Sequence, residues 1–232
     1  MRNNLFITLE GIDGSGKTTA GYEIKNRLQA KGLKVFYTAE PTDEPLGVFI
    51  KDYILKNSGK GNNLLYEYIN NLDEISYKLI CLFLFSSDRT AHLSSIKHKI
   101  KDYDIVICDR FIDSTFAYQS FEKTADKSKI KKAKEFIIKI NDFILEINDI
   151  KIDRTYLLDL DPEAASKRIS KKNEKSLFDV KSIDFFSKVR DNYKVLYKKY
   201  QNRIKLINAS RTSDEIVLEI LSDLDYFLNI NF

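Results

Sequence analysis

Apolar runs alternate along the chain with segments in which apolar residues recur at helical spacing. Five short runs predict buried strands, at residues 5–9, 33–38, 104–108, 155–159 and 203–207. Ala20, Ile24 and Leu28 recur every four residues, so a helix is predicted soon after the first strand. Strands that alternate with helices predict a three-layer α/β/α fold, with a five-stranded parallel sheet and helices on both faces. Ligands bind such sheets at the carboxyl ends of the strands.

The connecting segments carry helix signals of their own. Helices are predicted over residues 46–55, 64–101, 123–148 and 182–200, with a polar break at 57–63. Asp161-Pro162-Glu163 predicts a helix start, because Asp caps a helix N-terminus and Pro suits the first turn. Thr212 and Glu215 form a capping box that opens the last predicted helix.

The composition is that of an ordinary globular chain. Its 232 residues are enough for one well-packed domain, predicted to span residues 1–232. The net charge of +4 is mild and spread out, so it indicates no nucleic-acid partner, although it suits anionic substrates. In the lysine-rich segment 123–139 we expect the lysines to face solvent and Phe136, Ile137 and Ile140 to face inward.

The sequence also bears on the redox state of the cysteines and on where the protein is located. Cys81 and Cys108 each lie inside such a run and are predicted to be reduced, buried thiols; a disulfide between them is the alternative. The N-terminus leads straight into a strand, so no signal peptide is expected. The longest apolar run, residues 79–85, is far shorter than the roughly 20 residues that span a bilayer. We therefore expect a soluble, cytoplasmic protein without a membrane partner.

The sequence after the first strand fits the phosphate-binding pattern G-x-x-x-x-G-K-[ST]. Its fixed positions are Gly11, Gly16, Lys17 and Thr18. A phosphate needs backbone N–H groups at a helix N-terminus with a lysine beside them, and the Thr18 hydroxyl can hold the magnesium ion that accompanies a nucleoside triphosphate. The alternative is an ordinary glycine-rich turn, which the strand–loop–helix context disfavours.

A second cluster follows the third predicted strand. Asp109 and Arg110 end this strand, and Ser114, Tyr118 and Gln119 come shortly after. An Asp at such a strand end can hold magnesium, and the Arg beside it can bind a second phosphate through its fork of N–H groups. The alternative is a surface ion pair.

Two further clusters have a structural alternative. Phe85 and Arg89 are four residues apart, so they share a helix face on which a ring and a guanidinium can stack on and hydrogen-bond a base. The alternative is that Phe85 is core and Arg89 pairs with an acid. Arg168 with Lys171, Lys172 and Lys175 forms a basic segment that can close over phosphates, or else a solvated face.

Several of these segments together resemble one family. They are FITLEGIDGSGKTTA, Glu40-Pro41 followed by Pro45-Leu46-Gly47, LFSSDR, DRFIDSTFAYQ and LDLDPEAASKRI. The chain resembles the thymidylate kinases, of the nucleoside-monophosphate-kinase group of P-loop phosphotransferases, through most of its length and in the right order. The resemblance implies phosphorylation of dTMP to dTDP with ATP and Mg²⁺, in dTTP synthesis, by a homodimer.

The resemblance also implies roles on the donor side. Lys17 would hold ATP phosphates, Thr18 and Asp109 would hold Mg²⁺, and Arg168 would approach ATP from a lid at about residues 168–182. The whole ATP-binding loop would comprise Gly11, Ile12, Asp13, Gly14, Ser15, Gly16, Lys17, Thr18 and Thr19. Residues 208–211 would border the adenine.

On the acceptor side, the same resemblance implies a pocket for the monophosphate. Its residues would be Asp13, Phe85, Arg89, Arg110, Ser114, Tyr118 and Gln119. Phe85 would stack on thymine and Arg89 would bond its carbonyl edge, with Gln119 helping. Arg110 would hold the acceptor phosphate and Asp13 would reach the 3′-hydroxyl or the metal shell. Tyr118 would sit near C2′ and disfavour ribonucleotides.

The chain departs from the family pattern at positions that bear on catalysis. Many members have Arg before Glu-Pro, where this chain has Ala39, and others have an arginine-rich lid, where this chain has Lys171, Lys172 and then Ser176-Leu177. Gly14 also lacks the arginine that another branch carries in the P-loop. Lid lysines or Arg168 would then replace the arginine, or the activity is slow or the substrate differs.

Other functions are therefore kept as alternatives. The nearest is a kinase for another nucleoside monophosphate or for a deoxynucleoside, which would share the fold. A non-catalytic nucleotide-binding module is the alternative from a different class. A GTPase is disfavoured because the chain has no N-K-x-D motif, and an ABC-type ATPase because it has no glycine-rich signature.

Overall fold

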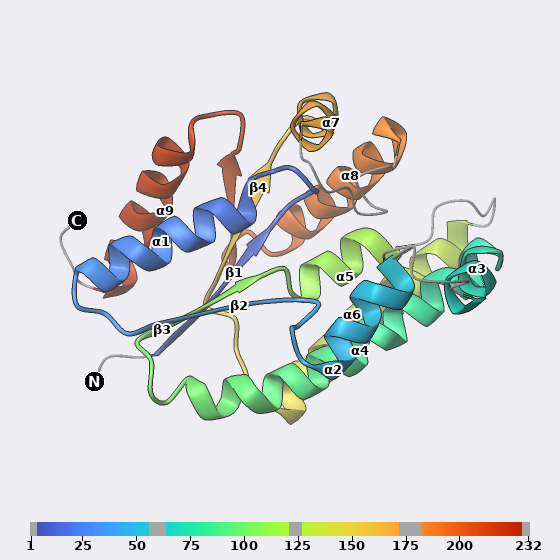
Figure 1. Cartoon of the computed structure of the whole chain (residues 1–232), viewed down its shortest axis with the longest axis horizontal. Coiled ribbons are helices and arrows are strands. Elements are labelled where there is room, and N and C mark those ends of the chain that lie inside the picture. Colours follow the sequence, from blue (N-terminus) through green and yellow to red (C-terminus); the bar gives the residue numbers. More distant parts are fainter. Residues whose placement is uncertain (1–3, 56–63, 121–126, 172–181, 229–232) are drawn as a thin grey trace.

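The strands form one parallel sheet that sets the position of everything else. The computed structural model describes residues 4–55, 64–120, 127–171 and 182–228. Its strands are β1 (Leu5–Glu10), β2 (Val35–Ala39), β3 (Ile105–Asp109), β4 (Arg154–Asp159) and β5 (Ile204–Asn208). Among these residues they lie in the order β2-β3-β1-β4-β5, and every pairing is parallel, as predicted (Figure 1).

The central strand is buried throughout because both of its faces are covered. Ile7 and Leu9 pack into one hydrophobic cluster, while Phe6 packs into another with Val106 and Cys108. All of β1 is buried. A strand with two dry faces reads as a continuous apolar run, which is why the strands could be predicted from the sequence.

Helices cover both faces of the sheet (Figure 1). On one face lie α1 (Lys17–Ala30) and α9 (Ser213–Leu228). On the other lie α4 (Glu74–Lys99), α5 (Ile112–Gln119), α6 (Lys127–Ile147) and α8 (Ile183–Lys199). At the carboxyl ends of the strands, α2 (Pro45–Phe49) and the π-helix η1 (Ile50–Leu55) come after β2, and α7 (Pro162–Ser170) comes after β4.

The prediction of one long helix over 64–101 is wrong in one respect. It is two helices, α3 (Leu64–Asn70) and α4, separated by a short break. Asp73 explains the break, because its carboxylate accepts hydrogen bonds from Ile75 N at 3.0 Å and Ser76 N at 3.1 Å and so caps α4. The helix predicted over 46–55 is confirmed as α2 followed by η1, although the π form of η1 was not predicted, and helix α5 was not predicted. The polar break at 57–63 lies outside the described residues.

Other local predictions are confirmed. Asp161 accepts a hydrogen bond from Glu163 N at 2.9 Å and caps α7. Glu215 accepts from Thr212 N at 2.9 Å and donates its own N–H to the Thr212 hydroxyl at 3.3 Å, which is the capping box. The two cysteines are buried free thiols. No described helix is both long and apolar enough to cross a bilayer.

Candidate active site

The P-loop lies at the carboxyl end of β1 and leads into α1. Gly14 has φ 79°, a left-handed conformation that glycine adopts without strain. A Cβ at Gly14 would also lie only 2.9 Å from the Ala165 carbonyl oxygen in α7. An arginine at position 14 is therefore excluded unless α7 moves, which accounts for its absence from this P-loop.

Lys17 is held inside the loop by its own backbone. Its Nζ donates to the carbonyl oxygens of Gly11 at 3.0 Å and Ile12 at 2.9 Å. Burial, and then the charge of Arg110, lower the Lys17 pKa to about 8. A buried ammonium group next to another cation is stabilised by a phosphate, which supplies the opposite charge.

Thr18 and Asp109 form a pair that suits a magnesium ion. The Thr18 hydroxyl donates to Asp109 Oδ2 at 2.5 Å, and Tyr37 OH donates to the same oxygen at 3.2 Å. The other oxygen, Asp109 Oδ1, is buried and has no hydrogen-bond partner in the described part of the chain. Mg²⁺ is commonly held by one or two carboxylates together with substrate phosphates, so this donor set fits it. Within the described residues no three His, Cys, Asp or Glu side chains cluster as a metal cage.

Arg110 and Asp13 meet between the P-loop and α5. Arg110 Nη2 is ion-paired with Asp13 Oδ1, and Tyr118 OH donates to Asp13 Oδ2 at 3.0 Å. Arg110 Nη1 also donates to Ser114 Oγ at 3.3 Å. Arg110 has φ 66°, so the backbone itself is turned to aim this side chain across the site.

Buried Glu10 supports this arrangement from beneath. Its carboxylate accepts from Phe111 N at 2.8 Å, Ser114 Oγ at 2.6 Å and Tyr193 OH at 2.9 Å. Burial, followed by the charge of Asp113, raises the Glu10 pKa to about 7. Glu10 was not predicted, although its place directly before the P-loop was a usable signal.

The motif residues line two cavities that meet. The donor cavity, of about 430 Å³, is lined by residues 13–20 and by Asp109, Arg110, Arg168, Arg211, Ser213 and Ile216; Gly11 and Ile12 do not line it. The acceptor cavity, of about 350 Å³, is lined by Asp13, Glu40, Pro41, Lys51, Leu55, Phe85, Arg89, Arg110, Phe111, Ser114, Thr115, Tyr118 and Gln119. Asp13 and Arg110 line both, so an anion in one cavity faces an anion in the other across these two side chains.

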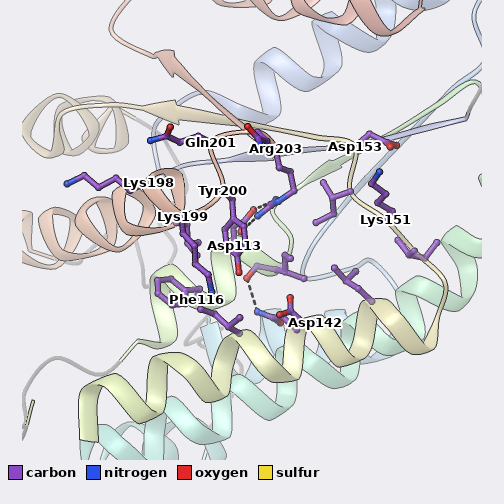
Figure 2. Close-up of a pocket in the computed structure, with 18 residues that line it drawn as sticks. Asp113, Phe116, Asp142, Lys151, Asp153, Lys198, Lys199, Tyr200, Gln201 and Arg203 are labelled. Carbon is purple, nitrogen blue, oxygen red and sulfur yellow. Dashed lines mark hydrogen bonds and ion pairs between the residues drawn. The ribbon is translucent and has the colours of Figure 1, made fainter. Parts of the chain in front are cut away.

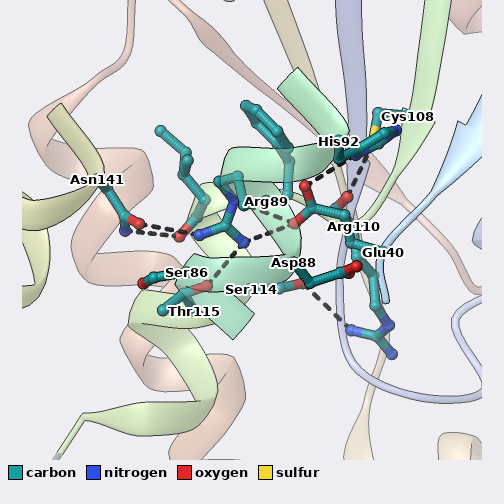
Figure 3. Close-up of polar contacts among 12 residues, drawn as sticks. Glu40, Ser86, Asp88, Arg89, His92, Cys108, Arg110, Ser114, Thr115 and Asn141 are labelled. Carbon is teal, nitrogen blue, oxygen red and sulfur yellow. Dashed lines mark hydrogen bonds and ion pairs between the residues drawn. The ribbon is translucent and has the colours of Figure 1, made fainter. Parts of the chain in front are cut away.

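Both sequence interpretations of Phe85 and Arg89 describe part of what is seen. Arg89 is only 1% exposed and does pair with an acid, donating from Nη2 to Glu40 Oε2 at 2.7 Å. Figure 3 shows Arg89 beside Glu40, and Arg89 also lines the acceptor cavity together with Phe85 and Gln119. The guanidinium that pairs with Glu40 is thus also part of the wall of the acceptor cavity.

The structure also brings in a cation that the sequence reasoning missed. Lys51 lines the acceptor cavity from η1, with Asp43 as its partner at 2.6 Å. Arg211, which lies in the segment 208–211 expected to border the adenine, lines the donor cavity and donates to the Asn208 carbonyl at 3.3 Å. The only sequence signal that Lys51 lines the acceptor cavity was its closeness in the sequence to the Glu40-Pro41 loop.

The predicted lid is described only in part. Arg168 lines the donor cavity, where its Nη2 donates to the Ala209 carbonyl at 3.0 Å. Lys171 is exposed. Lys172, Lys175, Ser176 and Leu177 lie outside the described residues.

A third groove, of about 810 Å³, lies at the opposite edge of the sheet (Figure 2). It is bordered by the segments that lead into β4 and β5, and Arg203 spans it to Asp113 at 2.8 Å. None of the predicted site residues lines it. The nucleotide chemistry is therefore assigned to the two cavities at the carboxyl edge.

A P-loop cavity beside a second cavity, with Asp13 and Arg110 lining both, is the arrangement expected of a nucleoside-monophosphate kinase. Comparison with known proteins narrows this class. A sequence model of the family described as thymidylate kinase matches residues 9–220. The chain belongs to the thymidylate kinase family.

Individual relatives agree over nearly the whole chain. The thymidylate kinase of Clostridium novyi is 34% identical over 223 residues, which cover 95% of this chain and 98% of that one. The probable thymidylate kinase of Methanocaldococcus jannaschii is 35% identical over 224 residues, 97% of each chain. The crystal structure of thymidylate kinase from Ehrlichia chaffeensis superimposes with a TM-score of 0.60 at 29% identity, covering 95% of this chain and 98% of that chain.

Proposed function

We propose that this chain transfers the γ-phosphoryl group of ATP to dTMP and releases ADP and dTDP, a step in dTTP synthesis. The observation that carries the proposal is the junction of the donor and acceptor cavities at Arg110 and Asp13. The substrates are metabolites of the cytoplasm, which is the compartment we propose.

The chemistry needs alignment and charge neutralisation more than proton transfer. A phosphate monoester is largely ionised near neutral pH, so its oxygen attacks the γ-phosphorus without a general base. The new P–O bond forms as the bond to the β-phosphate oxygen breaks, and ADP leaves with that oxygen. Mg²⁺, when bound by Thr18 and Asp109 with the phosphates, neutralises charge on the donor.

Each side chain at the junction has a proposed task. Lys17 neutralises the donor phosphates from inside the P-loop, and Arg110 holds the acceptor phosphate with its N–H fork. Asp13 and Tyr118 surround the sugar, with Ser114 supporting Arg110. Because the loop excludes an arginine at position 14, we assign the remaining positive charge near the transferred group to Arg168 and to the lid, residues 168–182.

Lys51 offers a replacement for the arginine that is absent at Ala39. Ala39 ends β2 and carries no charge. Lys51 lies in η1, directly after α2, and lines the acceptor cavity. Its partner Asp43 is fully exposed, so exchanging that contact for a substrate phosphate has little cost. Lysine supplies charge without the bidentate fork, which suits a supporting role.

A panel assay tests the function. The purified chain is given Mg·ATP with dTMP, dUMP, dCMP, UMP or thymidine, and ADP formation is followed. We expect the highest kcat/KM with dTMP. Preference for another acceptor would identify a kinase for a different monophosphate or nucleoside, and ATP binding without turnover of any acceptor would identify a binding module.

Replacing Arg110 tests the junction itself. We expect Arg110→Ala to lose about three decades or more of kcat/KM for dTMP, the lower range for removing an arginine from a phosphoryl-transfer site. Lys17→Ala should lose most activity as well, and both variants should keep the wild-type circular dichroism spectrum. Near-normal turnover in either variant would remove that residue from the mechanism.

We also propose that the chain forms a homodimer through α4. Ile75 and Phe83 on this helix are 47% and 53% exposed, a large apolar area to leave in water.

A further inference from the structure

The guanidinium of Arg89 donates most of its N–H groups to protein partners. An arginine has five N–H donors. Its Nε and Nη2 donate to Glu40 Oε2 at 3.0 and 2.7 Å, and Nη2 also donates to Thr115 Oγ1 at 2.9 Å. Nη1 donates to Asn141 Oδ1 at 3.0 Å. The described part of the chain supplies no hydrogen-bond acceptor for the second N–H of Nη1, and Arg89 lines the acceptor cavity.

The orientation of this last N–H depends on Glu40. Two of the four assigned Arg89 hydrogen bonds end on the single oxygen Oε2. The Glu40 carboxylate therefore fixes the guanidinium plane, and a rotation of the carboxylate would turn the plane with it. Glu40 is 6% exposed, so its carboxylate is oriented by protein groups and not by solvent.

His92 holds the other oxygen of that carboxylate. His92 Nδ1 lies 3.0 Å from Glu40 Oε1 (Figure 3). His92 Nε2 lies 2.7 Å from Thr38 Oγ1 on β2. Because an ionised carboxylate only accepts hydrogen bonds, Nδ1 carries the proton and donates it to Glu40. In the neutral ring, Nε2 then accepts from the Thr38 hydroxyl. The ring is 3% exposed and is tied at both nitrogens.

We infer that His92 is a positioning residue for base recognition, acting on Arg89 through Glu40. A chain of hydrogen bonds leads from β2 to the cavity: Thr38 to His92, His92 to Glu40, and Glu40 to Arg89. The sheet thereby sets the direction of the remaining Arg89 N–H. A pyrimidine carbonyl accepts that N–H, whereas the amino group of cytosine presents a donor and is rejected. This inference rests on the proposed function.

Two substitutions separate the two hydrogen bonds of the ring. In His92→Asn the side-chain amide nitrogen takes the place of Nδ1 and can still donate to Glu40. In His92→Gln it takes the place of Nε2, so the contact with Thr38 is kept and the one with Glu40 is lost. His98→Ala is the matched control, because His98 is exposed on the same helix.

Binding and turnover are then measured for each variant. We expect His92→Gln to weaken dTMP binding by calorimetry and to raise the KM for dTMP about tenfold, the size of one hydrogen bond to a charged group. Its KM for ATP and its kcat should stay near wild type, and its preference for dTMP over dCMP should fall. His92→Asn and His98→Ala should stay within about twofold of wild type in dTMP binding.

Three outcomes would overturn the inference. One is dTMP binding in His92→Gln that equals wild type. Another is an equal loss of dTMP and ATP affinity with a lower Tm in both His92 variants, which would make His92 a purely structural residue. The third is failure of the wild-type chain to bind dTMP. If the wild-type chain binds dTMP but transfers no phosphoryl group, the proposed function fails, while the dTMP affinities of the variants still decide the role of His92.

Discussion

Lys17, which we propose holds the ATP phosphates, carries an ammonium group that burial destabilises in the free protein. Burial lowers its pKa from 10.5 to about 8, so part of the population loses the ammonium charge in mildly alkaline solution. In the unfolded chain the same lysine stays charged up to about pH 10. Between these two values the unfolded state binds more protons, and the contribution of Lys17 to stability rises with pH.

The same pKa predicts how ATP binding depends on pH. We expect the affinity of the free protein for ATP to fall as pH rises through about 8, because the neutral amine no longer attracts phosphate. The ATP phosphates are already fully ionised there, so the ligand does not cause the change. Calorimetric titration from about pH 7 to about pH 9 measures it. An affinity that stays constant over this range would contradict the assignment.

Asp109 carries the prediction for the metal. We expect Asp109→Asn to require a higher concentration of free Mg²⁺ for half-maximal activity, because one carboxylate charge near the metal is lost. Chelation of Mg²⁺ should abolish phosphoryl transfer in the wild-type protein. Asp102→Asn is the control, since Asp102 is exposed and precedes the same strand. An unchanged Mg²⁺ dependence in Asp109→Asn would exclude this residue from the metal site.

At the level of elements, Asp88 fastens the loop after β2 to helix α4. Its two carboxylate oxygens accept from Thr42 N at 2.8 Å and Thr42 Oγ1 at 2.6 Å. Asp88 is 1% exposed. The loop carries Glu40 and Pro41 at the acceptor cavity and leads to Lys51. The clamp therefore sets one wall of the proposed dTMP pocket.

Removing the clamp should affect one substrate more than the other. We expect Asp88→Ala to cost about 1–3 kcal/mol of unfolding free energy, since two buried donors lose their acceptor. The KM for dTMP should rise several-fold while the KM for ATP changes little. Denaturant unfolding and steady-state kinetics measure both, with the exposed neighbour Ser87→Ala as the control. Equal changes in the two KM values would mean that the clamp supports the whole fold and not one wall.

The elements differ in how well the sequence predicted them. The strands were predicted to within about two residues, because a parallel sheet covered on both faces requires apolar runs. The break before α4 was missed because Asp73 lies inside a helix-period pattern and only its capping bonds reveal it. Helix α5 was missed because most of it is buried and its pattern is not amphipathic.

At the scale of the whole molecule, local motifs predicted which residues come together but not how they are paired. The pattern around Lys17 and the Asp109-Arg110 pair pointed to residues that line the two cavities at the carboxyl edge of the sheet. The contacts of Arg89 with Glu40 and Asn141 span 49 and 52 positions in sequence, and no local pattern encodes them. The spacing of residues 85, 89 and 92 puts His92 on the Arg89 face of the helix, which was a usable signal.

The outer surface of the molecule was predicted least well, and it bears on assembly. Phe136 was expected to face inward, but it is 43% exposed, and Phe143 and Ile147 on the same helix are 62% and 66% exposed. Helix α6 lies beside α4, where Ile75 and Phe83 are also exposed (Figure 1). Two neighbouring helices with exposed apolar side chains favour burial against a second copy over exposure to water.

A charge on α4 tests this assembly. We expect the wild-type chain to sediment as a dimer and Phe83→Glu to sediment as a monomer, because a carboxylate at the centre of an apolar interface loses its hydration without gaining a partner. Tyr226→Glu is the matched control, since Tyr226 on α9 is 86% exposed and far from α4 in the fold. Sedimentation velocity over a range of concentrations measures the result. A wild-type chain that stays monomeric would rule out the dimer, and a dimeric Phe83→Glu would move the interface away from this part of α4.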